Sequence, residues 1–227
     1  MIDWRDTRVA VLGGGGFLGG HIVARLRALG ADPIVPRTAA GWDFIALDSA
    51  ERFFAEHRPE VVINCAARQG GLDFQRRFPA EIYFDNLRLG ANCLHAAAGA
   101  GVRRYVDIIA ACSYPGDADR AQREDDYWAG PLHESVLNYG FTRKAQVVQG
   151  ECYRRQYGFD SIPLLMTNLY GPGEHFHPDR SHGLAALLLK FYEAKRFDRA
   201  CVELWGSGRP VREWLYVGDA AEAVVLA

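Results

Sequence analysis

The sequence lacks the features of membrane, secreted and nucleic-acid-binding proteins. No apolar run approaches the length of a bilayer span, and residues 1–6 lack the basic and then apolar layout of a signal peptide. Acidic and basic residues are spread along the 227-residue chain with a net charge of −2, so there is no basic stripe for nucleic acid and no polybasic membrane anchor. We expect a cytoplasmic protein that binds a small molecule, and neither nucleic acid nor a membrane.

Cysteine is scarce, and its spacing is irregular. The five cysteines are odd in number, widely spaced and without a CxxC pair, which argues against both a disulfide framework and a zinc knuckle. His175, His177 and His182 lie close together, but no cysteine or ordered carboxylate spacing accompanies them. We therefore expect a substrate loop at these histidines and no metal site.

Short apolar runs alternate with helix-like stretches in the first 170 residues. The helix-like stretches end at Gly30, Gly101 and Gly158, where glycine suits the left-handed conformation that follows a helix. This alternation predicts an α/β protein with a Rossmann-type, doubly wound parallel sheet that helices cover on both faces. The runs that we interpret as strands are 9–12, 34–35, 61–63, 105–109 and 162–166.

The pattern changes after residue 170. We interpret residues 1–170 as a dinucleotide-binding domain and 171–227 as the start of a smaller substrate-binding domain, with a helix over 184–194 and a strand over 202–205. Residues 211–227 begin another strand, turn and helix that returns to the first domain. Because the chain stops within an apolar helix face, we expect the substrate domain to be truncated.

A glycine-rich turn follows the first apolar run. Gly13, Gly16 and Gly19 have a GxxGxxG spacing between a predicted strand and a helix that runs to residue 29. Glycine allows the tight turn and lets backbone N–H groups approach a pyrophosphate at the helix N-terminus. The pattern predicts a dinucleotide site.

The end of the second predicted strand bears on the choice of dinucleotide. An acidic residue here would bind the ribose hydroxyls of NAD, but the sequence has Arg37, and Asp32 comes before the strand. A guanidinium at this place suits a 2′-phosphate. NADP(H) is therefore favoured, and NAD(H) remains possible because Arg37 could also be an ordinary surface charge.

Further motifs occur in a family-like order over nearly the whole chain. The motifs are NCAARQGG at 64–71, YFDN at 83–86, ACSYP at 111–115, EDDYW at 124–128, YGFTRK at 139–144, NLYGP at 168–172, SH at 181–182, WGSG at 205–208 and REWL at 212–215. Together they resemble the extended short-chain dehydrogenase/reductase family, and within it the GDP-L-fucose synthases and related NAD(P)-dependent sugar-nucleotide epimerase/reductases.

This resemblance implies that a 4-keto-6-deoxy sugar on a nucleoside diphosphate is epimerised beside its carbonyl and then reduced by NADPH. It makes Tyr139 the proton donor. It also makes Cys112 and His182 the epimerising pair, a role that suits a thiolate and an imidazole because both titrate near neutral pH. It also implies substrate contacts from Asn168, His182, Trp205 and Arg212. The cofactor contacts that it implies, beside the three glycines and Arg37, are Phe17, Leu18, Asp43, Ala66, Ala67, Tyr139 and Arg143.

Two catalytic positions depart from the family pattern. Ala110 stands where a serine is expected, and Arg143 stands where a lysine is expected four residues after Tyr139. Arg143 still faces Tyr139 on a helix and can lower its pKa, whereas Lys144 is about a quarter-turn away. Loss of the serine hydroxyl commonly costs roughly 10² to 10³ in rate, so reduction should be slow unless Ser113, Thr142 or water replaces it.

Three functions therefore remain open. The chain is an NADP(H)-dependent epimerase/reductase, a redox-silent epimerase, or a cofactor-binding subunit without catalysis.

The resemblance also implies a homodimer that pairs the helices around 82–98 and 139–157. These helices carry apolar residues beyond one core-facing stripe, which predicts a second apolar face; the residues are Leu87, Leu94, Val147 and Val148.

Overall fold

A four-stranded parallel sheet forms the centre of the protein. The computed structural model describes residues 2–116, 120–177, 181, 183–204, 206–209 and 211–227. Neighbouring strands pair in register, with Val9 beside Val61 and Val61 beside Arg104. In sheet order, the strands are β1 (Val9–Leu12), β2 (Val61–Asn64), β3 (Arg104–Ala110) and β4 (Ser161–Met166).

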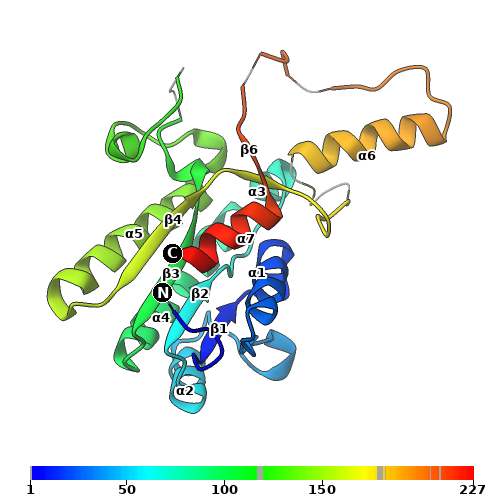
Figure 1. Ribbon diagram of the computed structural model, residues 1–227. Helices are drawn as coiled ribbons and strands as arrows, with labels where there is room; N and C mark the ends of the chain where they lie inside the picture. Colours follow the sequence, from blue (N-terminus) through cyan, green and yellow to red (C-terminus); the bar gives the residue numbers. More distant parts are fainter. Residues whose placement is uncertain (1, 117–119, 178–180, 182, 205, 210) are drawn as a thin grey trace.

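Helices cover both faces of this sheet (Figure 1). On one face α1 and α7 pack together, and Ile22 and Val224 join Val9 in an apolar core. On the other face lie α2, α4 and α5, where Phe53 and Leu94 pack with Leu12 of β1. Burial of these side chains on both sides confirms the predicted α/β class. The helices are α1 (Phe17–Ala28), α2 (Leu47–His57), α4 (Pro79–Gly99), α5 (Leu137–Tyr157) and α7 (Val217–Leu226).

The strand predicted at residues 34–35 is reduced to one bridge. Ile34 pairs with β1 through two backbone hydrogen bonds, from Val11 N–H to its carbonyl at 2.9 Å and from its N–H to the Val9 carbonyl at 2.8 Å. Pro33 and Pro36 flank Ile34-Val35 and have no N–H to donate to a sheet. The chain therefore passes the edge of the sheet without forming a full strand.

The segment from residue 168 onward departs from the main sheet. β5 (Asn168–Tyr170) and β6 (Trp214–Tyr216) form a separate parallel pair, and Figure 1 shows α6 (Gly183–Arg196) extending away from the sheet. The predicted helix over 184–194 is therefore confirmed. The strand predicted over 202–205 is wrong at 202–204, where no partner strand pairs with these residues among those described, and Trp205 lies outside them.

The final residues pass directly from β6 into α7, without the predicted turn. Val217, Ala220 and Val224 of α7 are buried against the same core as α1. The division into domains at residue 170 remains a prediction. Within the described ranges, no helix combines the length and apolar character needed to cross a membrane.

Candidate active site

The turn after β1 has the geometry of a phosphate-binding loop. Gly13 has φ +75°, a conformation that side chains rarely adopt, and Gly16 N–H closes the turn on the Gly13 carbonyl at 2.9 Å. α1 begins at Phe17 with Gly16 as its N-cap, and no side chain caps it among the described residues. The first N–H groups of α1, those of Phe17 and Leu18 included, are therefore suited to bind an anion.

The glycines also let three backbone segments approach closely. A Cβ on Gly13 would lie 2.8 Å from the Ala66 nitrogen, and one on Gly19 would lie 2.8 Å from the Gly13 carbonyl carbon. The loop after β2, which contains Ala66 and Ala67, therefore packs directly on the turn after β1. This cradle fits a dinucleotide pyrophosphate, and a side chain at either glycine would distort it.

Gly13→Ala should weaken NADPH binding at least about tenfold, because the added Cβ meets backbone and the residue must keep a positive φ. Gly15→Ala is the matched control: Gly15 lies in the same turn, and an added Cβ there meets nothing within 4 Å. NADPH fluorescence titration measures both variants, with thermal melting to check folding. Equal affinity in the two variants would contradict the assignment.

Arg37 follows the Ile34 bridge and is exposed. A Cβ on Gly14 would lie 2.9 Å from Val35 Cγ1, so this segment passes close to the phosphate-binding turn. The carboxylate of Asp43, an implied cofactor contact, binds the backbone in this structure: its Oδ1 accepts a hydrogen bond from the Ile45 N–H at 3.1 Å, just before α2. Its contact with a cofactor remains a prediction.

Tyr139 and Arg143 lie together on one face of α5. The guanidinium carbon of Arg143 is 4.8 Å from the centre of the Tyr139 ring, and both side chains are buried. Burial raises the pKa of Tyr139, and the charge of Arg143 opposes that rise. The cation that replaces the expected lysine therefore acts on the phenol in the expected sense.

Lys144 does not share this role. Its ammonium group donates to the backbone carbonyl of Tyr127 and lies 4.7 Å and 4.6 Å from the ring centres of Tyr127 and Trp128. Burial lowers its pKa. Lys144 therefore stabilises the 3₁₀ segment η3 (Glu124–Trp128) rather than replacing the missing lysine.

Cys112 lies in the short 3₁₀ turn η2 (Ala111–Ser113), against the start of α5. A Cβ on Gly140 would lie 2.6 Å from the Cys112 carbonyl oxygen, so a glycine beside Tyr139 lets α5 approach this turn. Burial raises the pKa of the Cys112 thiol to about 11, although Arg143 opposes the rise. The expectation of a thiol that titrates near neutral pH is therefore wrong for this structure, because desolvation outweighs the cation.

The two hydroxyls proposed to replace the missing serine are directed elsewhere. Ser113 Oγ donates to the Ala110 carbonyl at 2.6 Å and accepts from the Tyr127 hydroxyl at 3.1 Å. Thr142 Oγ1 donates to the Tyr139 carbonyl at 2.7 Å. Each hydroxyl has one proton, so neither can donate to a substrate oxygen in this arrangement.

Two of the expected substrate residues come together through the β5–β6 pair. Asn168 Nδ2 donates to the Glu213 carbonyl at 3.1 Å, and Arg212 precedes Glu213 with an exposed side chain. His182 and Trp205 lie outside the described residues. In the described part of the chain, no group of three histidine, cysteine or acidic residues could hold a metal ion.

Two buried polar pairs near Tyr139 were not predicted from the sequence. Asn64 Nδ2 donates to Asp107 at 3.0 Å, and Arg143 Nη1 donates to Gln146 Oε1 at 2.8 Å. Burial raises the pKa of Asp107 to about 6, against the opposing effects of Arg143 and Asn64. Gln146 lies three residues after Arg143 on one helix face, which is the only sequence signal that could have indicated this pair.

The turn after β1 and the buried Tyr139–Arg143 pair place the chain among dinucleotide-binding proteins of the extended short-chain dehydrogenase/reductase type. Residues 9–227 match the NAD dependent epimerase/dehydratase family, and the chain belongs to this family.

Relatives and solved structures agree with this assignment. The chain is 38% identical over 222 residues to the probable GDP-L-fucose synthase 1 of Oryza sativa subsp. japonica, covering 97% of this chain and 68% of that protein. It is 34% identical over 218 residues to the GDP-L-fucose synthase of Escherichia coli (strain K12), with coverages of 96% and 68%. It also resembles the GDP-L-fucose synthetase of Naegleria fowleri bound to NADP, with TM-score 0.84, 26% identity and coverages of 97% and 72%.

Proposed function

We propose that the protein is an NADP(H)-dependent epimerase/reductase of a nucleoside diphosphate 4-keto-6-deoxy sugar, similar to GDP-L-fucose synthase. The observation that carries this proposal is the Arg143 guanidinium over the Tyr139 ring, at the start of α5, where Gly140 lets the helix approach the turn that holds Cys112. The relatives' names give the substrate class, and the glycine cradle after β1 fits the cofactor.

The residues divide the proposed reaction between proton transfer and carbonyl polarisation. Cys112 and His182 exchange protons at the carbons next to the C4 carbonyl. Tyr139 then donates its phenolic proton to the carbonyl oxygen, while Arg143 stabilises the phenolate that remains. NADPH, when bound, supplies the hydride that reduces C4. Trp205 and Arg212 hold the nucleotide portion, Arg212 through the diphosphate, and Asn168 is a further substrate contact.

The redox-silent epimerase is the second candidate. It is favoured by Ala110 together with the occupied hydroxyl protons of Ser113 and Thr142, which leave the carbonyl oxygen with one fewer donor. A single panel separates the candidates: purified protein, several nucleoside diphosphate 4-keto sugars, NADPH absorbance and solvent deuterium uptake. NADPH oxidation supports the first, deuterium uptake alone supports the second, and neither activity despite NADPH binding indicates a non-catalytic subunit.

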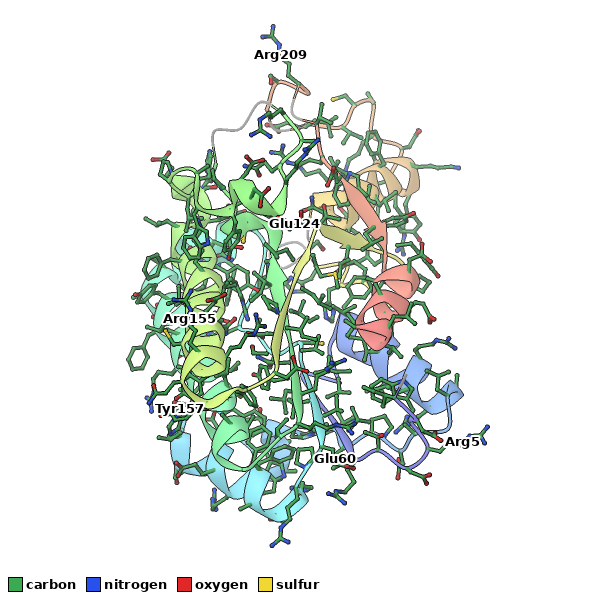
Figure 2. All side chains as sticks on the ribbon, turned by 60° about the vertical axis from the view of Figure 1, so that its left-hand side comes forward. Arg5, Glu60, Glu124, Arg155, Tyr157 and Arg209 are labelled. Carbon is green, nitrogen blue, oxygen red and sulfur yellow. The ribbon has the colours of Figure 1, made fainter. Side chains whose placement is uncertain are left out.

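NADP(H) is the proposed cofactor, with NAD(H) possible. We expect the wild type to bind NADPH more tightly than NADH. Arg37→Ala should lower the affinity for NADPH about tenfold and leave the affinity for NADH unchanged, since one charge-assisted contact contributes ~1.4 kcal/mol. Arg155→Ala is the control, because Arg155 is exposed on α5, across the sheet from α1 (Figure 2). Equal wild-type affinities, or an unchanged NADPH affinity in Arg37→Ala, would argue against this preference.

A homodimer through α4 and α5 is also part of the proposal. Tyr83 and Phe141 stack across these helices with ring centres 6.2 Å apart, and both remain exposed, as do Phe84 and Val148. The prediction that Leu94 belongs to this second apolar face is wrong, because Leu94 is fully buried inside the chain, against the sheet. A cytoplasmic location remains an expectation.

Phe141→Glu should dissociate this dimer, because a charge would be desolvated in the centre of an apolar contact. Leu188→Glu, at an exposed leucine of α6, should leave the dimer intact. Light scattering at micromolar concentration measures both. A monomeric wild type, or dissociation of the two variants alike, would exclude this interface.

A further inference from the structure

Gln146 fills a space between α4 and α5 that exists because residue 90 is glycine. Gln146 is buried on α5, and Gly90 lies opposite it on α4. A Cβ on Gly90 would overlap the Gln146 amide group and lie 2.7 Å from its Cγ, and all three nearest atoms belong to Gln146. The glycine therefore accommodates one particular side chain.

That side chain is the main acceptor for Arg143. Gln146 Oε1 accepts from Arg143 Nη1 at 2.8 Å, whereas Nη2 reaches Asn86 Oδ1 and the Ala66 carbonyl only at 3.3 Å and 3.4 Å. Hydrogen bonds weaken towards the long end of this range. Arg143 Nε has no partner within the described chain, so the bond to Gln146 has the largest influence on the guanidinium's orientation.

A guanidinium needs such an acceptor more than an ammonium does. Its donors are fixed in a planar fork, so rotation about the side chain changes which groups they face. Several titratable groups surround Arg143 and respond to its position: Tyr139 on α5, Asp107 and Tyr105 on β3, Cys112 in η2 and Cys65 after β2. Gln146 is neutral, so replacing it moves the cation without changing the charge of the site.

We propose that Gln146, in the space left by Gly90, is a positioning residue that holds the Arg143 guanidinium over Tyr139 and thereby sets the acidity of the proton donor. This inference rests on the proposed function, since it concerns the acid of that reaction. It explains how arginine can stand where the family pattern has a lysine: the longer, planar side chain has an acceptor at its end, and the facing helix leaves room for that acceptor.

The test follows the ionisation of Tyr139 directly, without turnover. The protein is labelled with fluorotyrosine, whose phenol is a stronger acid than tyrosine's, and Tyr139→Phe assigns the ¹⁹F resonance. In Gln146→Met, which keeps the volume but removes the acceptor, the Tyr139 pKa should rise by about one unit, a tenfold weaker acid. If 4-keto sugars are turned over, kcat should fall with KM unchanged.

Gly90→Ala tests the same contact from the other helix. It should displace Gln146 and raise the Tyr139 pKa as Gln146→Met does, whereas Gly99→Ala should not, because a Cβ on Gly99 of α4 meets nothing within 4 Å. In the double variant Gln146→Ala/Gly90→Ala, the short side chain at position 146 leaves room for the Cβ at position 90. The Tyr139 pKa should therefore be the same in the double variant as in Gln146→Ala alone. This double variant also remains informative if Gly90→Ala alone fails to fold.

An unchanged Tyr139 pKa in folded Gln146→Met, or equal shifts in Gly90→Ala and Gly99→Ala, would overturn the positioning role. Failure of the proposed function looks different. If no nucleoside diphosphate sugar is turned over but the Tyr139 pKa still rises in Gln146→Met, the proposed reaction is contradicted and the positioning role of Gln146 is supported.

Discussion

Ala110→Ser should raise the rate of NADPH-dependent carbonyl reduction by up to about 10², the scale of one oxyanion donor. Ala110 ends β3 at the edge where η2 meets the start of α5, and Ser113 and Thr142 donate their protons to backbone carbonyls. A new hydroxyl at 110 would therefore add a donor that neither Ser113 nor Thr142 supplies. It accelerates the reaction because its hydrogen bond is strongest to the charge that develops in the transition state.

Ala111→Ser is the matched control, since it adds the same hydroxyl to the neighbouring alanine. Arg143→Lys should help less than Ala110→Ser, because a cation already lies beside Tyr139. Stopped-flow NADPH oxidation with a 4-keto sugar measures the three variants. If Ala110→Ser and Ala111→Ser both oxidise NADPH at the wild-type rate, the missing hydroxyl does not limit the hydride step.

Local pattern was sufficient for the parts of the site that depend on one element and its neighbours. The glycine spacing predicted the turn at Gly13, and the helical period predicted that Arg143 faces Tyr139. Both follow from local backbone geometry, which the order of residues largely determines. Pro33 and Pro36 carried an equally local signal against a full strand, which the apolar Ile34-Val35 pair obscured.

Features that depend on packing between distant segments could not be predicted in this way. Gly90 and Gln146 are 56 positions apart, and their contact depends on how closely α4 approaches α5. The raised pKa of Cys112 has the same origin, since it reflects how completely the surrounding segments exclude water. A family pattern places such a cysteine beside the substrate, but it does not give the acidity of the thiol.

That acidity makes the epimerising pair testable by pH as well as by substitution. At pH 7 a thiol with a pKa of about 11 is ionised only about once in 10⁴ molecules. If the Cys112 thiolate is the base that removes the proton next to the carbonyl, deuterium uptake should rise about tenfold for each pH unit through the range in which the protein stays folded. If Cys112 instead donates its proton, uptake should stay flat over that range, because the thiol form predominates throughout.

Cys112→Ala and His182→Ala should each abolish deuterium uptake at one or both of the carbons next to the carbonyl. Each variant removes one of the two groups that carry protons to and from these carbons. Cys152→Ala is the control, because Cys152 is an exposed cysteine on α5. Mass spectrometry of the recovered sugar nucleotide counts the deuterons, and NADPH titration checks that the cofactor site is intact. Wild-type uptake in both Cys112→Ala and His182→Ala would remove the epimerising pair. Loss of uptake in Cys112→Ala with a steep rise in the wild type from pH 7 to 9 would identify the thiolate as the base, and would show that the buried thiol limits the reaction at neutral pH.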